Sequence, residues 1–372
     1  ITPLDEEALA ALAAALKAEG VEAIAIGFLH AYANDEHERR AGAILAALLP
    51  EIPISLSSEV CPEIREYERL STTVANAYVR PKMAGYLDAL ARDLTAAGLS
   101  CPLFMVTSAG GITTLQAAMD FPIRLVESGP SGGAVLAEIT AEQNGARDVL
   151  SYDMGGTTAK ICLIGDYRAA TAREFEAART ARFAKGSGIP LRIPVVEMIE
   201  IGAGGGSIAA IDGLKRVAVG PHSAGAEPGP ACYGRGGSLP TVTDADLALG
   251  RLDAERFAEG RLRLDTGATD RAIGSAIGAP LGLTGLDAPR AICEIVDEAM
   301  ANAARVHAVE HARDLRAATM IAFGGAGPLH AGRLAEKLGI TRIIVPANPG
   351  VGSAVGFLSM PVSYEVVQSR YM

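Results

Sequence analysis

One short run in the middle of the chain combines an acid, two glycines and two hydroxyls: Asp153, Gly155, Gly156, Thr157 and Thr158. Apolar runs at 149–152 and 161–164 flank it and indicate two short buried strands with a tight turn between them. Glycines let backbone N–H groups approach a phosphate, because no Cβ stands in the way. A carboxylate at the strand end suits a hydrated Mg²⁺ or an oriented water. The run therefore indicates phosphate binding, although spacing alone leaves an ordinary hairpin turn open.

A second glycine run, Gly324, Gly325 and Gly327, follows a short apolar strand at 320–323, and Pro328 suits the first turn of a helix. A dinucleotide-binding fold has the same order of strand, glycine turn and helix. That fold also places an acidic residue at the end of a following strand about 20 residues on. No acidic residue stands there, so dinucleotide binding is disfavoured. His330, on the helix, is read as a packed or surface histidine, with a ligand or catalytic role as the alternative.

Six further polar residues form a second candidate group: Glu200, Ser207, His222, Cys232, Asp244 and Asp246. In an extended strand, Asp244 and Asp246 would face the same way and share a cation. At a helix start they would cap the helix and be solvated, and we favour this because an apolar helical run follows at once. A nucleophile built from Cys232 and His222 remains open but is disfavoured, because Cys232 lies in a glycine-rich segment.

The composition excludes several classes of protein. With 372 residues, 49% hydrophobic content and 42 glycines, the chain is expected to form two or three α/β domains with many tight turns. The net charge of −10 and the absence of long basic runs argue against nucleic-acid binding. No apolar run is long enough for a membrane span. The five cysteines are scattered without a metal-binding spacing, which fits a reducing cytoplasm.

Elements that would position the two glycine turns can be placed along the chain. Strand and helix patterns alternate from residue 4 to residue 60, as in a covered parallel sheet. A long helical pattern covers 63–98, either as one helix or as two broken at Arg80–Pro81. Small residues at 126–134 open a further helix; they suit close packing, with phosphate binding at the helix start as the alternative. A largely helical stretch is expected over 251–283, and a strong amphipathic helix over 292–309.

Several motifs together resemble one family. Asp153–Lys160, with the letters DMGGTTAK, resembles the second phosphate loop of actin-like ATPases, and more narrowly that of the hydantoinase A/5-oxoprolinase family. The runs EIGAGGGS at 200–207, GPACYGRGG at 229–237 and FGGAGPLH at 323–330 follow in that family's order. The similarity covers nearly the whole chain, and within the family the chain resembles an N-methylhydantoinase A-type subunit.

The resemblance implies an α/β, actin-like (ribonuclease H-like) fold with two lobes around a nucleotide cleft. The expected divisions are 1–146, the first lobe and its connecting helix; 147–348, the second lobe with a glycine-rich insertion; and 349–372, a second connecting helix and the start of a C-terminal region. In this reading Gly155, Gly156, Thr157 and Thr158 hold phosphate, and Asp153 is the catalytic residue that holds Mg²⁺ or water. The adenosine of ATP lies on Gly324, Gly325 and Gly327.

The function that the resemblance implies is ATP-dependent phosphorylation of a cyclic amide, such as a hydantoin or 5-oxoproline, for ring opening. A partner subunit of the hydantoinase B type is expected, and a homo-oligomer is possible. The alternatives are a carboxylase subunit that activates a ketone, and a non-catalytic nucleotide-sensing subunit. Both ends of the chain read as interior segments. The family's first phosphate loop, an Asp-x-Gly-Gly-Thr pattern, has no second copy here, so the chain alone is expected to bind ATP weakly and not to hydrolyse it.

Overall fold

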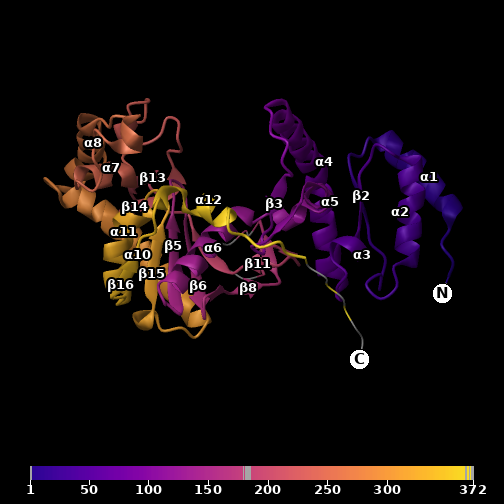
Figure 1. Ribbon diagram of the computed structural model, residues 1–372. Coiled ribbons are helices and arrows are strands. Elements are labelled where there is room, and N and C mark those ends of the chain that lie inside the picture. The colour runs from indigo at the N-terminus through magenta and orange to yellow at the C-terminus, as the bar shows by residue number, and fades with distance from the viewer. Residues whose placement is uncertain (1, 179, 181–185, 365–366, 368, 370–372) are drawn as a thin grey trace. The chain divides into compact units, whose positions relative to one another are not determined.

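Helices and strands alternate along the part of the chain that the computed structural model describes, residues 2–178, 180, 186–364, 367 and 369 (Figure 1). They divide into two units. The first holds Ile1–Ser131, Thr171–Val196 and Met360–Met372, and the second holds Gly132–Ala170 and Glu197–Ser359.

The first unit is built on short strands and one long helix. Its helices are α1 (Glu6–Glu19), α2 (Glu36–Leu48), α3 (Ser57–Val60), α4 (Glu66–Ala96), α5 (Leu115–Asp120) and the 3₁₀ turn η1 (Pro122–Leu125). Its strands are β1 (Ile24–Ile26), β2 (Ile54–Leu56), β3 (Phe104–Val106), β4 (Ile112–Thr114), β8 (Thr171–Ala172), β9 (Phe175–Ala177), β10 (Ile189–Leu191) and β11 (Val195–Val196). Strands β1 and β2 are parallel, as the alternating pattern predicts.

The second unit carries one larger sheet. The strands of the second unit are β5 (Asp148–Met154), β6 (Ala159–Gly165), β7 (Arg168–Ala169), β12 (Met198–Ile201), β13 (Ser207–Ile211), β14 (Val217–Ser223), β15 (Thr319–Phe323) and β16 (Arg342–Ile344). Of these, β13 and β14 pair with each other outside the larger sheet. Its helices are α7 (Val242–Ala248), α8 (Thr266–Ile273), α9 (Ala279–Leu281), α10 (Asp287–Glu310), α11 (Gly327–Leu338) and α12 (Gly352–Phe357). Helix α6 (Ser128–Gln143) runs from the first unit into the second, and single turns η2 (Ala231–Tyr233), η3 (Phe257–Gly260), η4 (Gly274–Gly278), η5 (Leu315–Ala317) and η6 (Pro349–Val351) complete the chain.

The order of strands in the larger sheet is β12-β6-β5-β15-β16, with β7 added to β6. Strands β5 and β6 form the antiparallel hairpin that the flanking apolar runs predict, whereas β15 lies parallel to β5. Parallel strands end at the same edge of a sheet, so the turn after β5 and the turn after β15 lie together. The topology therefore brings the two glycine runs of the sequence to one edge.

Side chains of β5 alternate between two faces of this sheet. Tyr152 and Met154 belong to the apolar core that also contains buried residues of α10 and α11. On the opposite face, Phe323 of β15 packs closely on Gly133 of α6 and Gly352 of α12. Asp153 therefore faces the α6 and α12 side, and its neighbour Tyr152 faces α10 and α11.

Several boundaries differ from those expected. The units divide at Ser131–Gly132 rather than near 147, because Gly132 and Gly133 of α6 pack on α12 and on Phe323 of the larger sheet. Of the two alternatives for 63–98, the single helix is confirmed, since α4 continues through Pro81. The apolar run at 54–60 leaves the strand after Leu56 and becomes α3. The stretch 251–283, expected to be largely helical, is helical over 266–281, where the turn η4 joins α8 to α9, and has only the turn η3 before that.

No helix among the described residues is long and apolar enough to cross a membrane.

Candidate functional site

The tip of the β5–β6 hairpin, residues 155–158, is open to solvent at Gly156 and Thr157. The Gly155 N–H donates to the Thr158 carbonyl at 3.0 Å, which closes the turn. A Cβ built on Gly155 meets nothing nearer than 4.0 Å, and one built on Gly156 meets nothing within that distance. Neither glycine has a positive φ. The fold itself therefore does not require glycine at these two positions, and the bare backbone leaves room for a ligand.

A second loop, residues 202–206, supports this tip from behind, and we refer to it as the backing loop. Gly205 and Gly206 donate their N–H groups to the carbonyls of Gly155 and Gly156, at 3.0 and 2.7 Å. A Cβ on Gly204 would lie 2.6 Å from the Thr157 nitrogen, so the contact requires glycine. The sequence shows that this run is glycine-rich but does not show that it packs on the β5–β6 hairpin. We refer to that hairpin as the phosphate hairpin, because phosphate binding is predicted there.

Asp153 stands at the end of β5, beside both glycine turns. Its Oδ2 accepts a hydrogen bond of 3.1 Å from the Ser353 hydroxyl of α12. Burial raises the pKa of Asp153, while the Ser353 hydrogen bond and the charge of Lys160 act in the opposite direction. A single carboxylate beside a phosphate loop fits the way proteins hold Mg²⁺, with few protein ligands and the rest from water and nucleotide phosphates. The described residues contain no larger cluster of metal-binding side chains.

The second glycine turn, residues 324–327, is where adenosine is predicted to bind, and we refer to it as the adenosine turn. It packs directly on the phosphate hairpin. Gly324 has a φ of +84°, and a Cβ there would lie 2.3 Å from the Met154 carbonyl and 2.5 Å from Asp153 Oδ1. The Ala326 N–H donates to the same Met154 carbonyl at 2.9 Å. Gly325, in contrast, is exposed and has open space where its Cβ would stand. Gly327 is the first residue of α11.

Lys160 is a further candidate that the sequence analysis left without a role. It pairs with Asp153 across β5 and β6 and with Glu200 across β6 and β12. Its Nζ donates to Thr158 Oγ1 at 3.2 Å and lies 3.4 Å from Glu200 Oε1. The lysine is thus a cation beside the phosphate hairpin, where a nucleotide phosphate would find a charged partner.

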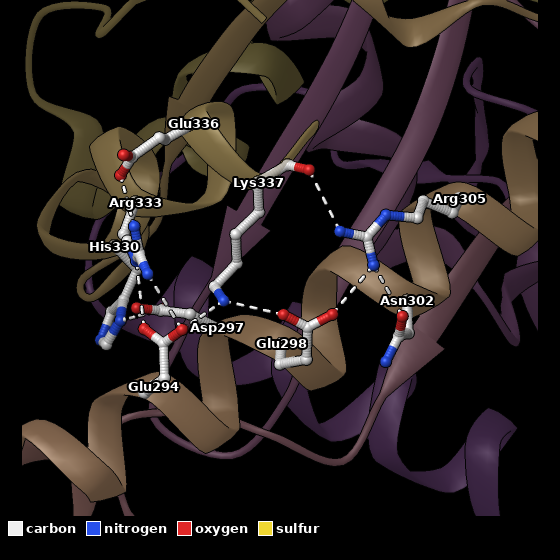
Figure 2. Close-up of polar contacts among 9 residues, drawn as sticks. All are labelled: Glu294, Asp297, Glu298, Asn302, Arg305, His330, Arg333, Glu336 and Lys337. Atoms are coloured by element: carbon white, nitrogen blue, oxygen red, sulfur yellow. Dashed lines mark hydrogen bonds and ion pairs between the residues drawn. The ribbon is translucent and has the colours of Figure 1, made fainter. Parts of the chain in front are cut away.

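A buried charged cluster lies behind the adenosine turn. His330 of α11 is fully buried, with Nδ1 2.7 Å from Asp297 Oδ1 of α10 and Nε2 3.1 Å from Asp246 Oδ2 of α7. Figure 2 shows the imidazole beside Asp297 and the more exposed ion pairs of α10 and α11 further along the same helices. Burial acts to lower the pKa of His330, but the hydrogen bonds to Asp246 and Asp297 outweigh it and raise that pKa to about 9. The expectation of a packed histidine holds, with a charged ring.

Asp244 and Asp246 take different roles. Asp244 forms a capping box with Thr241 at the start of α7, as favoured from the sequence. Both carboxylates are buried rather than solvated, because Asp244 accepts backbone N–H groups of Ala231 and Cys232. Asp246 pairs with His330, as described above, and with the Arg251 guanidinium at 2.9 Å.

The structure does not support Cys232 as a nucleophile. Its side chain is fully buried, and burial together with the neighbouring Asp244 carboxylate raises the pKa of its thiol. His222 is exposed. A reactive cysteine needs an accessible thiolate, so Cys232 is a core residue and Ser207, whose hydroxyl accepts from Gly204 N–H at 2.9 Å, is a loop support.

Comparison with known proteins identifies relatives that match nearly the whole length of this chain. A family model described as hydantoinase/oxoprolinase matches residues 69–365, and one for the N-terminal region of the same family matches residues 1–49. The caprolactamase subunit alpha of Pseudomonas jessenii is 35% identical, over 98% of this chain and 51% of that protein. The 5-oxoprolinase of Saccharomyces cerevisiae is 33% identical, over 97% of this chain and 28% of that protein.

A solved structure has the same fold. The nucleotide-free structure of acetone carboxylase, an ATP-dependent enzyme by its description, aligns with a TM-score of 0.80 and 28% identity, over 96% of this chain and 50% of that one. The chain spans about half the length of the first curated relatives that it matches.

Proposed function

Because this chain belongs to the hydantoinase/oxoprolinase family, we propose that it is the nucleotide-binding part of an ATP-dependent subunit that activates a cyclic amide for ring opening. Its fold is the α/β, actin-like ATPase fold expected from the sequence.

One observation carries the proposal: the phosphate hairpin and the adenosine turn share a hydrogen-bonded junction at the Met154 carbonyl, with Asp153 beside it. Gly155, Gly156 and Gly325 leave open space at this junction although the fold does not need glycine there. We assign the phosphates of ATP to Gly155, Gly156, Thr157 and Thr158, and adenosine to Gly324, Gly325 and Gly327. Lys160 adds a cation on the phosphate side.

The proposed chemistry is phosphoryl transfer to the amide oxygen. The carbonyl oxygen of the cyclic amide attacks the γ-phosphorus, the bond to the β-phosphate oxygen breaks, and ADP leaves. Water then adds to the activated carbon, and the ring C–N bond breaks to leave an acyl phosphate and a free amine. A second water attacks the acyl carbon and breaks its C–O bond to phosphate, which releases the amino acid and inorganic phosphate that carries the original carbonyl oxygen. Mg²⁺ held at Asp153 would offset the charge that develops on the phosphate oxygens. The chain's own groups position the nucleotide and donate hydrogen bonds to it.

Hydrolysis of the activated amide is assigned to a partner subunit of the hydantoinase B type. The relatives support this division of labour, since one of them is by name an alpha subunit. The likeness to acetone carboxylase favours one second candidate, a subunit that phosphorylates the oxygen of a ketone enol before carboxylation.

An isotope experiment on the complete enzyme with its partner separates these functions. Cyclic amides labelled with ¹⁸O at the carbonyl are incubated with ATP and Mg²⁺, and inorganic phosphate is analysed by mass spectrometry. Label in the phosphate supports amide activation. Turnover only with ketones and bicarbonate supports the carboxylase function. ATP binding without phosphoryl transfer to any amide or ketone would leave nucleotide sensing as the function.

A further inference from the structure

Helix α7 (Val242–Ala248) lies between the supports of the two nucleotide loops. Its residues from Val242 to Leu247 are all buried. Asp244 fixes its start by accepting hydrogen bonds from Thr241 N–H and Oγ1, at 2.9 and 2.8 Å, and from the Cys232 N–H at 2.8 Å. Because α7 is short and firmly held, a displacement on one side of the helix moves the other side as well and is not taken up by local rearrangement.

One side of α7 reaches the phosphate hairpin. The Thr243 N–H and hydroxyl both donate to the Gly205 carbonyl, at 2.7 and 2.8 Å. The Gly205 N–H in turn donates to the Gly155 carbonyl at 3.0 Å. Two peptide groups therefore separate α7 from the residue proposed to hold phosphate.

The same helix reaches the adenosine turn through a buried charge. Asp246 contacts His330 Nε2 at 3.1 Å, and His330 stands three residues after Gly327 on α11. Asp297 holds the other ring nitrogen at 2.7 Å. A neutral imidazole carries one N–H, so two ionised carboxylate partners require an N–H on each nitrogen and hence an imidazolium. The partly exposed Arg251 guanidinium pairs with the buried Asp246 and balances the second carboxylate charge.

We propose that α7 couples the two nucleotide loops, with Thr243 as the positioning residue for the phosphate hairpin and Asp246 with His330 as the positioning pair for the adenosine turn. The inference rests on the proposed ATP site. None of the three residues touches the nucleotide in this assignment. In this assignment ATP contacts both loops, so the affinity for ATP depends on the spacing between them. Adenosine alone or triphosphate alone contacts one loop only. A shift of about 1 Å at one end is enough to lose much of the joint affinity.

Asp246→Asn tests the coupling, because it keeps the shape of the side chain and removes its charge. Glu294→Gln is the matched control: Glu294 pairs with Arg333 and Lys337 and so also joins α10 to α11 (Figure 2), but its side chain is partly exposed and these ion pairs include no residue of α7. Binding of ATP, adenosine and inorganic triphosphate to the complete enzyme is measured by calorimetry. In Asp246→Asn we expect the affinity for ATP to fall about tenfold or more. The affinities for adenosine alone and for triphosphate alone should each change less than about threefold. The control is expected to retain all three affinities.

Hydrogen exchange without nucleotide gives an independent readout. Asp246→Asn should speed exchange at both 155–158 and 324–327, and Glu294→Gln at neither. Thr243→Val serves as a second variant, since it removes one hydroxyl donor with little change in volume; it should speed exchange at 155–158 and lower ATP affinity more than triphosphate affinity. Unchanged ATP affinity in Asp246→Asn overturns the coupling. So does a loss of ATP affinity that is matched by equal losses for adenosine and triphosphate and by a lower melting temperature. A wild-type enzyme that binds no ATP instead overturns the proposed function.

Discussion

The Ser353 hydroxyl donates a hydrogen bond of 3.1 Å to Asp153 Oδ2, which ties helix α12 to the carboxylate at the end of β5. Ser353 lies 200 residues further along the chain, in the stretch expected to be a connecting helix. A side chain of α12 thus orients the proposed metal ligand.

Removal of this hydrogen bond should therefore affect the nucleotide complex. In Ser353→Ala we expect the KM for Mg·ATP to rise by up to about tenfold, as for loss of a hydrogen bond to a charged group, with a smaller change in kcat. Steady-state kinetics of the complete enzyme measure it. Ser359→Ala, at an exposed serine just beyond α12, is the control. Identical kinetics in the two variants would exclude an orienting role for Ser353.

Asp153→Asn keeps the size of the side chain and removes its charge. If Asp153 holds the cation, phosphoryl transfer should fall by roughly 100-fold or more, because a metal clamp contributes several kcal/mol to the transition state. The melting temperature of the variant should stay close to that of the wild type, since the carboxylate is only partly buried. An unchanged rate with unchanged melting contradicts the assignment.

Lys160 is expected to act on the phosphates. Lys160→Met should weaken binding of ATP and inorganic triphosphate by about tenfold, as expected for loss of a charge-assisted contact, and leave adenosine binding unchanged. Lys215→Met, in the exposed turn between β13 and β14, is the control. A loss of adenosine binding equal to that of triphosphate would show that Lys160 acts through the fold.

Gly325→Val places a side chain where the structure leaves open space. We expect weaker binding of ATP but not of inorganic triphosphate, because the new side chain crowds adenosine alone. Gly332→Val, on the exposed side of α11 with equally open surroundings, controls for the loss of helix stability. Equal losses for ATP and triphosphate would move the base and ribose away from this turn.

The buried imidazolium of His330 predicts a pH dependence of stability. Its pKa is about 9 in the folded protein against 6.5 as the ordinary value. The raised pKa contributes stability that is fully present below about 6.5 and is lost as pH rises through about 9, on the order of 3 kcal/mol. Charged or titratable side chains near it come from α7, α10, β5 and the loop after α7: Asp246, Asp297, Cys293, Tyr152 and Arg251.

Chemical denaturation between pH 6 and 9.5 measures this loss. The difference between wild type and His330→Gln isolates it from the other titrating groups. His222→Gln, at an exposed histidine, should follow the wild-type curve. Parallel curves for wild type and His330→Gln would show that the ring is not charged in the folded protein.

The sequence predicts the parts of the site that are local in the chain. The phosphate hairpin is a confirmed structural prediction, because Gly155 and Gly156 and the two strands around them are contiguous. The order of strand, turn and helix around Gly325 is local in the same way. The ligands of these loops stay a prediction.

The buried cluster could not be predicted, because its members are paired only in space. His330 is 33 residues from Asp297 and 84 from Asp246. The sequence indicates a solvated capping role for Asp246, because an apolar helical run follows Asp244 and Asp246 at once. The position of Lys160 in the site could not be predicted for a related reason: its neighbours Asp153 and Glu200 are identified only once the strand register is known.

The glycines around the site divide into two kinds, and this division gives a way to judge natural variants. Gly204 and Gly324 lie against backbone atoms at distances no Cβ tolerates, so their loss unfolds the site whatever the protein binds. Gly155, Gly156 and Gly325 have no such neighbour. Under the proposed assignment, a variant chain with larger residues at these three positions and glycine at 204 and 324 would fold but lose nucleotide binding, so the two kinds of change can be told apart from the sequence.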